Sequence, residues 1–211
     1  MKRCLIIFDF DGVLADSFKT FYLLIRACMR QIGLSFTPAQ YRDLFIGNVH
    51  QGFKDFINNE EKYLIFSEFR KANYDKYYYN KNNRVKLFPG VLEFLKKLDK
   101  KHILAIASSG KEDNIKNLLK KNRVEKLFSL ILADTANSKE SMIKEILNKF
   151  HAKPEETFFI ADTVGDIITA KKCGLKTIAV TWGFHSAKVL KSANPDCMAK
   201  NPKEIQKILN Q

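Results

Sequence analysis

The sequence of 211 residues has only four cysteines and four histidines, and neither type is clustered. The cysteines are Cys4, Cys28, Cys173 and Cys197, and the histidines are His50, His102, His151 and His185. No two cysteines have the close spacing that zinc sites and redox motifs use, so we interpret them as small core residues in a reducing compartment. The dispersed histidines likewise give no support for a histidine-based metal site.

Long apolar runs are also missing, and none approaches the length needed to span a bilayer. The opening MKRCLIIF is similar to the basic start of a signal peptide, but Asp9 interrupts the apolar stretch and no small-residue cleavage site follows. We therefore expect a cytoplasmic protein with no membrane partner. The hydrophobic content of 45% is that of a globular chain, large enough for a main domain with a smaller insert.

Acidic residues are in deficit, with 23 Asp and Glu against 36 Lys and Arg, which gives a net charge of +13. The lysines are spread over nearly every helical stretch and occupy its polar side, as in a solvated surface. Only residues 74–86, YDKYYYNKNNRVK, mix aromatic and basic residues as single-strand binders do. The charge pattern therefore argues against a nucleic-acid partner and favours attraction of small anionic substrates. It leaves monomer and homodimer open.

From residue 86 onward, short apolar strands alternate with amphipathic helices. The spacing predicts strands over 103–107, 129–133, 157–161 and 176–181, with helices between them and a last helix near Pro202. The stretch CLIIFDFD at residues 4–11 reads as one more strand. Such alternation predicts an α/β fold with a Rossmann-like parallel sheet covered by helices on both faces.

Residues 17–84 break this alternation, because they show helical spacing and no evident strand. An apolar stripe begins at Phe18, Gly33 ends that helix, and Thr37 with Pro38 marks the start of another. We therefore predict a core domain of residues 1–14 and 87–211, interrupted by an all-helical cap domain of residues 15–86. The linkers are expected near Asp16 and Gly90.

Two carboxylates, Asp9 and Asp11, stand in the apolar stretch CLIIFDFDGVL. In a strand their side chains share a face, where like charges need a cation, a shared proton or solvent to offset their repulsion. The alternative is a turn at Asp11–Gly12 with Asp9 as a solvated residue. The first interpretation predicts a metal-assisted carboxylate site at the end of the strand.

Polar residues also follow the other predicted strands, at the edge where open parallel sheets bind ligands. They are Ser108, Ser109, Gly110, Asp162 and Asp166, with Lys139 at the start of a helix. Taken singly, each has an ordinary explanation as a loop residue, a helix cap or a surface lysine. Together with Asp9 and Asp11 they supply four carboxylates, a hydroxyl and an ammonium, which is an inventory suited to metal-assisted phosphoryl transfer.

In their order, FDFDGVLADS, IASSGK, Lys139 and FFIADTVGD resemble the motifs of the haloacid dehalogenase superfamily, in its phosphoglycolate phosphatase-like branch. The resemblance covers almost the whole chain, because TWGFHSAKVLKSANPDCMAKNPKEI is similar to the C-terminal end of that group. It implies a phosphatase that hydrolyses a small phosphomonoester, a phosphorylated metabolite, through an aspartyl-phosphate and with Mg²⁺ as cofactor.

The resemblance also implies residue roles. Asp9 would be the nucleophile, Asp11 the acid and base, Ser108 a ligand of the phosphoryl oxygens and Lys139 the balancing cation. Mg²⁺ would be held by Asp9, the backbone carbonyl of Asp11, and Asp162. Asp166 would support the metal without binding it directly. Ser109 and Gly110 would contact the substrate in the core. Asn48 and His50, in the loop around Gly47 and Gln51, are the cap residues we expect to select it.

Two departures from the family pattern bear on the alternatives. Ala161 stands where many members have glycine, which should leave the adjacent acid intact. The insert segment FIGNVHQGFKDF has no arginine, a residue that the family's phosphomutases tend to carry there. This absence disfavours a sugar phosphomutase, which stays as the second hypothesis. A dehalogenase is disfavoured too, because Asp11 is present and dehalogenation does not need that acid. A catalytically silent binding protein is the third hypothesis, and the intact carboxylate set argues against it.

Overall fold

The computed structural model describes residues 3–134 and 137–210. It divides into two compact units, which we describe separately. The α/β unit comprises Met1–Asp16 and Leu87–Gln211, and the helical unit comprises Ser17–Lys86. The predicted domain ranges include residues 1, 2, 135, 136 and 211, which lie outside the described residues.

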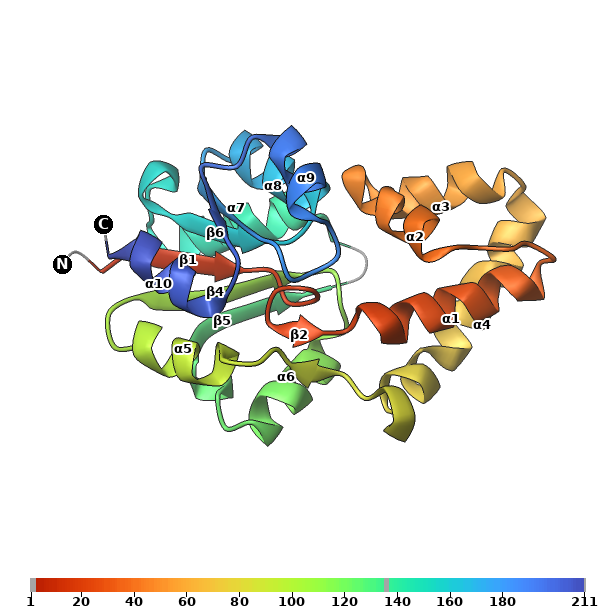
Figure 1. Ribbon diagram of the computed structural model, residues 1–211, viewed down its shortest axis with the longest axis horizontal. Coiled ribbons are helices and arrows are strands. Elements are labelled where there is room, and N and C mark those ends of the chain that lie inside the picture. The colour runs from red at the N-terminus through yellow and green to blue at the C-terminus, as the bar shows by residue number, and fades with distance from the viewer. Residues whose placement is uncertain (1–2, 135–136, 211) are drawn as a thin grey trace. The chain divides into compact units, whose positions relative to one another are not determined.

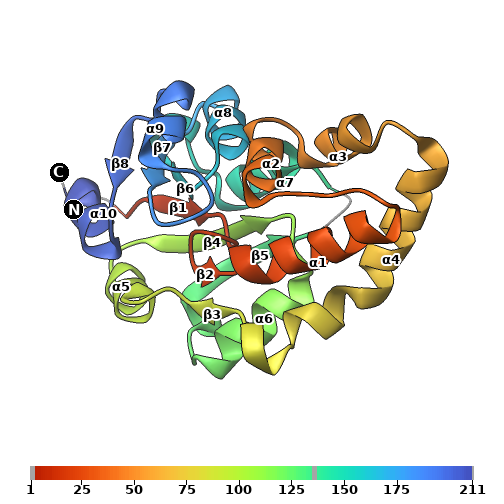
Figure 2. The same ribbon diagram turned by 45° about the vertical axis from the view of Figure 1, so that its right-hand side comes forward.

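The α/β unit is built on a six-stranded sheet in the order β5-β4-β1-β6-β7-β8, whose neighbouring strands run parallel (Figures 1 and 2). The strands are β1 (Leu5–Phe8), β4 (Ile103–Ser108), β5 (Phe128–Ala133), β6 (Phe158–Ala161), β7 (Lys176–Val180) and β8 (Cys197–Ala199). The predicted α/β fold class with a Rossmann-like parallel sheet is confirmed.

Helices cover both faces of this sheet, with α7 and α8 on one side and α5 and α6 on the other (Figure 1). The helices of the unit are α5 (Val91–Leu98), α6 (Glu112–Lys121), α7 (Lys139–Phe150), α8 (Val164–Lys172), α9 (Ala187–Leu190) and α10 (Pro202–Leu209). Their starts follow local chemistry, since Ser138 Oγ caps α7 by accepting the N–H of Ser141 at 3.1 Å.

The two faces of β1 pack into two different layers because side chains alternate along a strand. Ile7 pairs in register with Ala105 and Phe159, and all three belong to the buried cluster that includes residues of α7 and α8. Phe8 points to the other face, where its ring meets the edge of Phe94 of α5 at 6.2 Å. The central strand is thus apolar throughout, as the sheet requires.

The predicted strand over residues 4–11 is wrong in extent, because β1 ends at Phe8. Gly12 adopts φ +78°, and its N–H donates to the carbonyl of Ala15, while the N–H of Leu14 donates to the carbonyl of Phe10. This tight loop turns the chain away from the sheet. Asp9 and Asp11 therefore lie in a loop, and strand alternation does not decide where their side chains point.

Three strands were not predicted. β8 is a short edge strand, and β2 (Ala15–Asp16) pairs with β3 (Lys86–Leu87) as a two-residue ladder. Segments this short carry too few residues to show a period of two, so their pairing depends on the neighbouring chain. These strands lie outside residues 17–84, a range in which the structure shows no strand.

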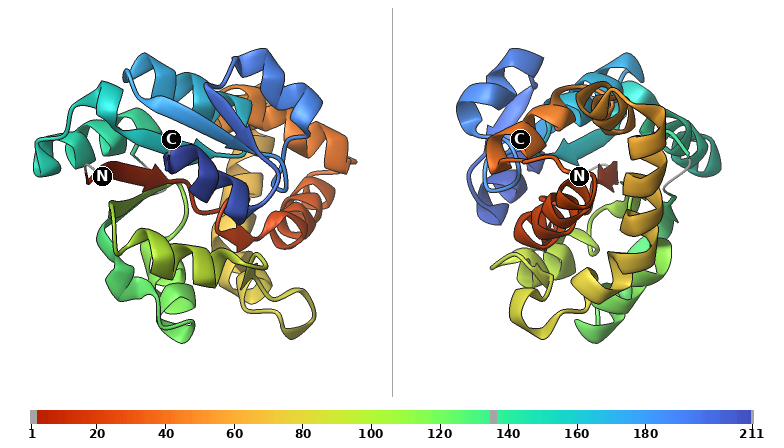
Figure 3. Two further views of the ribbon diagram at one scale, coloured as in Figure 1. Left: turned by 60° about the vertical axis from the view of Figure 1, so that its left-hand side comes forward. Right: turned by 90° about the vertical axis from the view of Figure 1, so that its right-hand side faces the viewer.

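The helical unit contains α1 (Phe18–Gln31), α2 (Pro38–Asp43), α3 (Val49–Ile57) and α4 (Glu60–Tyr78). Short 3₁₀ turns of this unit lie at Leu44–Ile46 and Lys81–Asn83, and those of the α/β unit lie at Glu125–Leu127, Pro154–Glu156 and Lys191–Ala193. α1 packs against α4, and the ring centroids of Phe21 and Tyr74 lie 5.6 Å apart. In Figure 3, α1 is drawn in red and α4 in yellow. The predicted start of α2 is confirmed, because Thr37 and Gln40 form a reciprocal capping box before Pro38.

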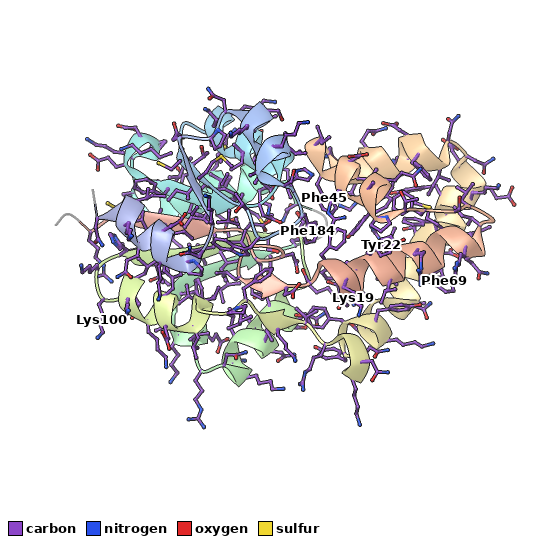
Figure 4. All side chains as sticks on the ribbon, in the orientation of Figure 1. Lys19, Tyr22, Phe45, Phe69, Lys100 and Phe184 are labelled. Carbon is purple, nitrogen blue, oxygen red and sulfur yellow. The ribbon has the colours of Figure 1, made fainter. Side chains whose placement is uncertain are left out.

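Lysine side chains such as those of Lys19 and Lys100 are exposed (Figure 4), in agreement with the solvated surface expected from the sequence. Over residues 3–134 and 137–210, no helix has both the length and the apolar character that crossing a membrane would require.

Candidate active site

The carboxyl ends of β4, β1 and β6 lie side by side, because β1 pairs with both of the other strands. Ser108 is the last residue of β4, Asp9 follows β1 directly, and Asp162 follows β6 directly. The N–H of Asp9 donates to the carbonyl of Ile160 at 2.9 Å, which continues the β1–β6 ladder up to the site. The sheet topology therefore gathers at one edge residues that lie up to 153 positions apart in the chain, as Asp9 and Asp162 do.

Lys139, at the first position of α7, reaches this edge and contacts two carboxylates. Its Nζ lies 2.6 Å from Oδ1 of Asp9 and 3.4 Å from Oδ2 of Asp166. The side chains of Lys139 and Asp9 are only 10% and 8% exposed. The N–H of Phe10 also donates to Oδ1 of Asp9, at 2.7 Å, so two donors fix the orientation of that carboxylate. The alternative reading of Lys139 as a surface lysine is wrong.

Asp162 is fully buried, and its two oxygens differ in their surroundings. Oδ2 accepts the N–H of Phe184 at 2.6 Å. Oδ1 is buried and receives no hydrogen bond from the described residues. A Cβ atom at Gly12 or at Gly183 would overlap with Oδ2, so the carboxylate occupies space that only glycine at both positions leaves open.

Burial and mutual repulsion alter the acidity of this cluster. Burial raises the pKa of Asp9 well above its ordinary value; Lys139 opposes the increase, and Asp166 and Asp162 reinforce it. Burial likewise raises the pKa of Asp162 to about 8. For Lys139, burial lowers the pKa, but the carboxylates of Asp166 and Asp9 outweigh it and raise the value overall. One ammonium thus faces three carboxylates, which leaves an excess of acidic groups.

Ser108, Gly110 and Asp11 form the neighbouring part of the site. Ser108 is buried, and its Oγ accepts the N–H of Gly110 at 3.1 Å. A Cβ atom at Gly110 would lie 3.3 Å from both Ser108 Oγ and Asp11 Oδ2, so the hydroxyl and the carboxylate face the same small space. Ser109 is exposed, in the same loop. The structure therefore brings the predicted hydroxyl close to the predicted acid.

Asn48 and His50 belong to the helical unit. Oδ1 of Asn48 accepts the N–H groups of His50 and Gln51 at 3.0 and 3.1 Å, which makes Asn48 the N-cap of α3. Asn48 and Gln51 also line a groove of about 440 Å³ in this unit. Burial lowers the pKa of His50, and Arg70 and Lys54 lower it further. Their assignment as substrate contacts stays a prediction.

Asp162 and Asp166 are not helix caps, so that alternative reading is wrong as well. The N-cap of α8 is Thr163, whose Oγ1 accepts the N–H of Asp166 at 3.3 Å. Asp166 lies in the first turn of α8 with its side chain 18% exposed, and that turn carries it to Lys139. The cap chemistry falls to a neighbouring threonine, which leaves both carboxylates for the site.

The loop of residues 181–186, TWGFHS, was missed as part of the site; we call it the TWGFHS loop. Nε1 of Trp182 donates to the carbonyl of Val13 at 3.1 Å, and the N–H of Val164 donates to Nδ1 of His185 at 3.0 Å. Figure 4 labels Phe184, the residue that binds the Asp162 carboxylate. The loop follows β7, so the strand-end rule that selected the other residues also selects this one.

The donor set bears on which metal the site could hold. Among residues 3–134 and 137–210, no three His, Cys, Asp or Glu side chains form a group that could hold a metal ion unaided. Mg²⁺ is commonly held by one or two carboxylates while it keeps several waters, so this observation is compatible with it. The buried Oδ1 of Asp162 and the Asp9 carboxylate supply hard oxygen ligands of the kind that such an ion prefers.

A family model described as haloacid dehalogenase-like hydrolase matches residues 6–180, which is most of the chain and includes Asp9, Ser108, Lys139 and Asp162. The chain belongs to this family. The family and the enzyme class predicted from the motifs, a hydrolase, are confirmed. The match ends at Val180, before the TWGFHS loop.

Relatives of known name align with this hydrolase along nearly their whole length. A phosphoglycolate phosphatase of Synechococcus elongatus is 28% identical, over 98% of this chain and 97% of the relative. The pyrophosphatase PpaX of Oceanobacillus iheyensis is 25% identical, with 97% and 95% covered. A solved haloacid dehalogenase-like family hydrolase from Streptococcus pneumoniae superposes with a TM-score of 0.80 at 25% identity, covering 98% of each chain. The similarity supports the phosphoglycolate phosphatase-like branch.

Proposed function

We propose that this haloacid dehalogenase-like hydrolase is an Mg²⁺-dependent phosphatase that cleaves small phosphomonoesters through a phosphorylated Asp9. The observation that carries the proposal is the buried contact of Lys139 Nζ with Asp9 Oδ1 at the carboxyl edge of the sheet. The Lys139 ammonium opposes the rise that burial causes in the pKa of Asp9, which favours the anionic form, and it adds positive charge where a phosphate would bind. The names of the relatives, a phosphoglycolate phosphatase and a pyrophosphatase, support small phosphorylated substrates.

The first half of the reaction transfers the phosphoryl group to the enzyme. A carboxylate oxygen of Asp9 attacks phosphorus, and the bond between phosphorus and the ester oxygen breaks. Asp11, protonated at this stage, gives its proton to the leaving alkoxide, which departs as an alcohol. Ser108 Oγ donates a hydrogen bond to a phosphoryl oxygen, and Lys139 balances the charge that develops on the others.

The second half releases phosphate. Asp11, now ionised, takes a proton from water, and the resulting oxygen attacks phosphorus. The bond from phosphorus to Asp9 breaks, which restores the Asp9 carboxylate and frees inorganic phosphate. Both half-reactions balance in protons, since the one that Asp11 gives to the alcohol is replaced by the one it takes from water.

The carboxylates of Asp9 and Asp162, with the backbone carbonyl of Asp11, would hold Mg²⁺, and Asp166 would support it through Lys139. The ion would neutralise charge on the phosphoryl oxygens. It would also relieve the repulsion that raises the pKa values of Asp9 and Asp162. The donor set contains oxygen only, which favours Mg²⁺ over zinc.

In this proposal the helical unit acts as a cap that shields the phosphorylated Asp9 from stray water and admits small ligands only. Its residues Asn48 and His50 would then contribute to substrate choice. The partner is accordingly a small phosphorylated metabolite, taken up by a monomer or a homodimer in the cytoplasm.

The test is phosphate release from a panel of small phosphate compounds by protein stripped with EDTA, with and without added Mg²⁺. The panel includes phosphoglycolate, sugar phosphates, nucleoside monophosphates, pyrophosphate and an aryl phosphate. We expect release from several members that depends strictly on Mg²⁺. Release that persists in EDTA contradicts the metal role, and isomerised sugar phosphate without free phosphate would identify a phosphomutase instead. Binding without turnover of any member would identify a catalytically silent protein.

A further inference from the structure

Consecutive residues of the TWGFHS loop bind the segment that carries Asp162. The N–H of Phe184 donates to Oδ2 of the Asp162 carboxylate at 2.6 Å. The N–H of His185 donates to the backbone carbonyl of Asp162 at 3.3 Å. The imidazole of His185 accepts the N–H of Val164 on Nδ1 at 3.0 Å. Asp162 is thus held at its side chain, at its backbone and two residues further on.

The bond from Val164 determines the chemical form of His185. A backbone N–H can only donate, so Nδ1 must be unprotonated and the imidazole hydrogen must be on Nε2. His185 is 3% exposed, so water does not readily replace it as the acceptor. The N–H of Val164 is one of the helix-terminal donors that have no partner within α8, and an acceptor outside the helix has to satisfy it.

The hydrogen bond from Val164 to His185 helps to position two carboxylates near the proposed metal, those of Asp162 and Asp166. Val164 is the first residue of α8, and Asp166 lies in the first turn of the same helix. Thr163 accepts the N–H of Asp166, and His185 accepts that of Val164, so two acceptors together set where α8 begins. The start of α8 in turn sets the direction of the Asp162 carboxylate before it and of the Asp166 carboxylate after it.

We propose that His185 is a positioning residue for the metal site: its Nδ1 holds the start of α8 so that Oδ1 of Asp162 is aimed at the ion. This inference rests on the proposed function. Oδ1 is the buried oxygen of Asp162 that receives no hydrogen bond from the described residues. It can bind a cation at the site only if the carboxylate keeps this orientation. Groups that orient metal ligands typically change metal affinity by about 10- to 100-fold when they are lost.

The experiment measures Mg²⁺ affinity by isothermal titration calorimetry on the full chain without substrate. In His185→Leu the volume is kept and the acceptor is lost, and we expect the Kd for Mg²⁺ to rise by about 10-fold or more. His185→Asn places an amide oxygen near the position of Nδ1 and should bind within about threefold of wild type. In steady-state assays of His185→Leu, saturating Mg²⁺ should return kcat toward wild type, since only the affinity is impaired.

His102→Leu is the matched control. His102 is also 3% exposed, lies at the opposite end of β4, and its ring nitrogens have no hydrogen-bond partner among the described residues. Its substitution should leave the Kd for Mg²⁺ unchanged. An unchanged Kd in folded His185→Leu would overturn the inference, as would equal losses in His185→Asn and His185→Leu. If His185→Leu does not fold, the Kd values of His185→Asn and His185→Gln for Mg²⁺ are compared instead. Glutamine places its oxygen beyond the position of Nδ1, so equal Kd values would overturn the inference.

The wild type separates the two proposals. Mg²⁺ binding by wild type together with an unaffected His185→Leu overturns the positioning role alone. The wild type is titrated with millimolar Mg²⁺, with Asp162→Asn as the blank. If the wild type does not bind Mg²⁺, both the metal role in the proposed function and this inference are overturned.

Discussion

Lys139 and Asp9 are separated by 130 positions in the chain, yet Nζ of Lys139 lies 2.6 Å from Oδ1 of Asp9. The contact forms because β1 is central in the sheet and α7 begins at the same carboxyl edge. Both partners are nearly buried, so neither charge is screened by solvent as a surface pair would be. The pair therefore matters both for folding and for any chemistry at Asp9.

Lys139→Met removes the only ammonium that contacts the carboxylates of Asp9 and Asp166 in the described site. We expect the free energy of unfolding to fall by about 3–5 kcal/mol in the absence of metal, because buried carboxylates lose their partner. Turnover should fall by about 100-fold or more. Urea unfolding and steady-state kinetics measure the two effects. Lys144→Met, on the exposed side of the same helix, should change neither; equal effects of both substitutions would contradict the assignment.

Asp9→Asn keeps the shape of the side chain and removes the anionic nucleophile. Turnover of an aryl phosphate should fall by about four orders of magnitude or more, while circular dichroism stays that of wild type. Acid-quenched protein incubated with labelled substrate should carry covalent phosphate in the wild type and none in the variant. Asp99→Asn, at the end of α5, is the control. Wild-type rates in Asp9→Asn would rule out covalent catalysis at this residue.

The raised pKa of Asp162 predicts how stability depends on pH without metal. An aspartate in the unfolded chain has a pKa of about 3.9, whereas folded Asp162 has a pKa of about 8. Between these values the folded state holds a proton that the unfolded state has lost, so the free energy of unfolding falls as pH rises toward about 8. The same sign holds for Asp9, whose pKa is also raised.

Melting temperatures in EDTA between pH 7 and 8 measure this slope. Histidines whose pKa is lowered by burial, such as His102, affect stability only up to about pH 6.5 and do not contribute here. Cys28, whose pKa burial raises to about 12, contributes in the same direction, so the measure is wild type minus Asp162→Asn. We expect a steeper decline in wild type, and Mg²⁺ should reduce it. Identical slopes in both proteins would refute the prediction.

Gly183→Ala tests the packing around Asp162. A Cβ atom there would overlap with Oδ2 of Asp162 and with the carbonyl oxygen of Gly12, and one of these neighbours is backbone. We expect a loss of stability of about 1–3 kcal/mol, typical of overpacking, and weaker Mg²⁺ binding. Gly47→Ala, where an added Cβ meets nothing within 4 Å, should stay within about 0.5 kcal/mol of wild type. Thermal melts distinguish the two, and a neutral Gly183→Ala would show that the loop yields.

The helical unit is expected to select the substrate through Asn48 and His50. Because Asn48 caps α3, Asn48→Ala would cost about 1 kcal/mol of stability and confuse the result, whereas Asn48→Asp keeps an acceptor for the cap. Asn48→Asp combined with His50→Ala should change the ranking of small substrates more than the rate on an aryl phosphate. Ratios of kcat/KM across the substrate panel provide the measurement. Uniform losses on every substrate would mean that these residues are not selective.

The sequence by itself determined the alternation of strands and helices in the α/β unit, since period and cap chemistry are local. Ser138 before α7 and Gly174 after α8 are readable without neighbours. It also determined which polar residues stand at strand ends, so Asp9, Ser108 and Asp162 could be selected as candidates. The motif order extended this to the family, which the match over residues 6–180 confirmed.

Only the tertiary structure decided which of these residues meet. Spacing in the chain indicated that Asp9 and Asp11 repel each other on one face of a strand, but that strand ends at Phe8, before the loop at Gly12. The carboxylates that raise the pKa of Asp9 belong to Asp166 and Asp162. The contacts of Gly183 and His185 could not be predicted from the sequence either. Their contacts with Asp162 and Val164 arise where β7 and β6 lie side by side, and contacts between neighbouring strands leave no periodic trace in either segment.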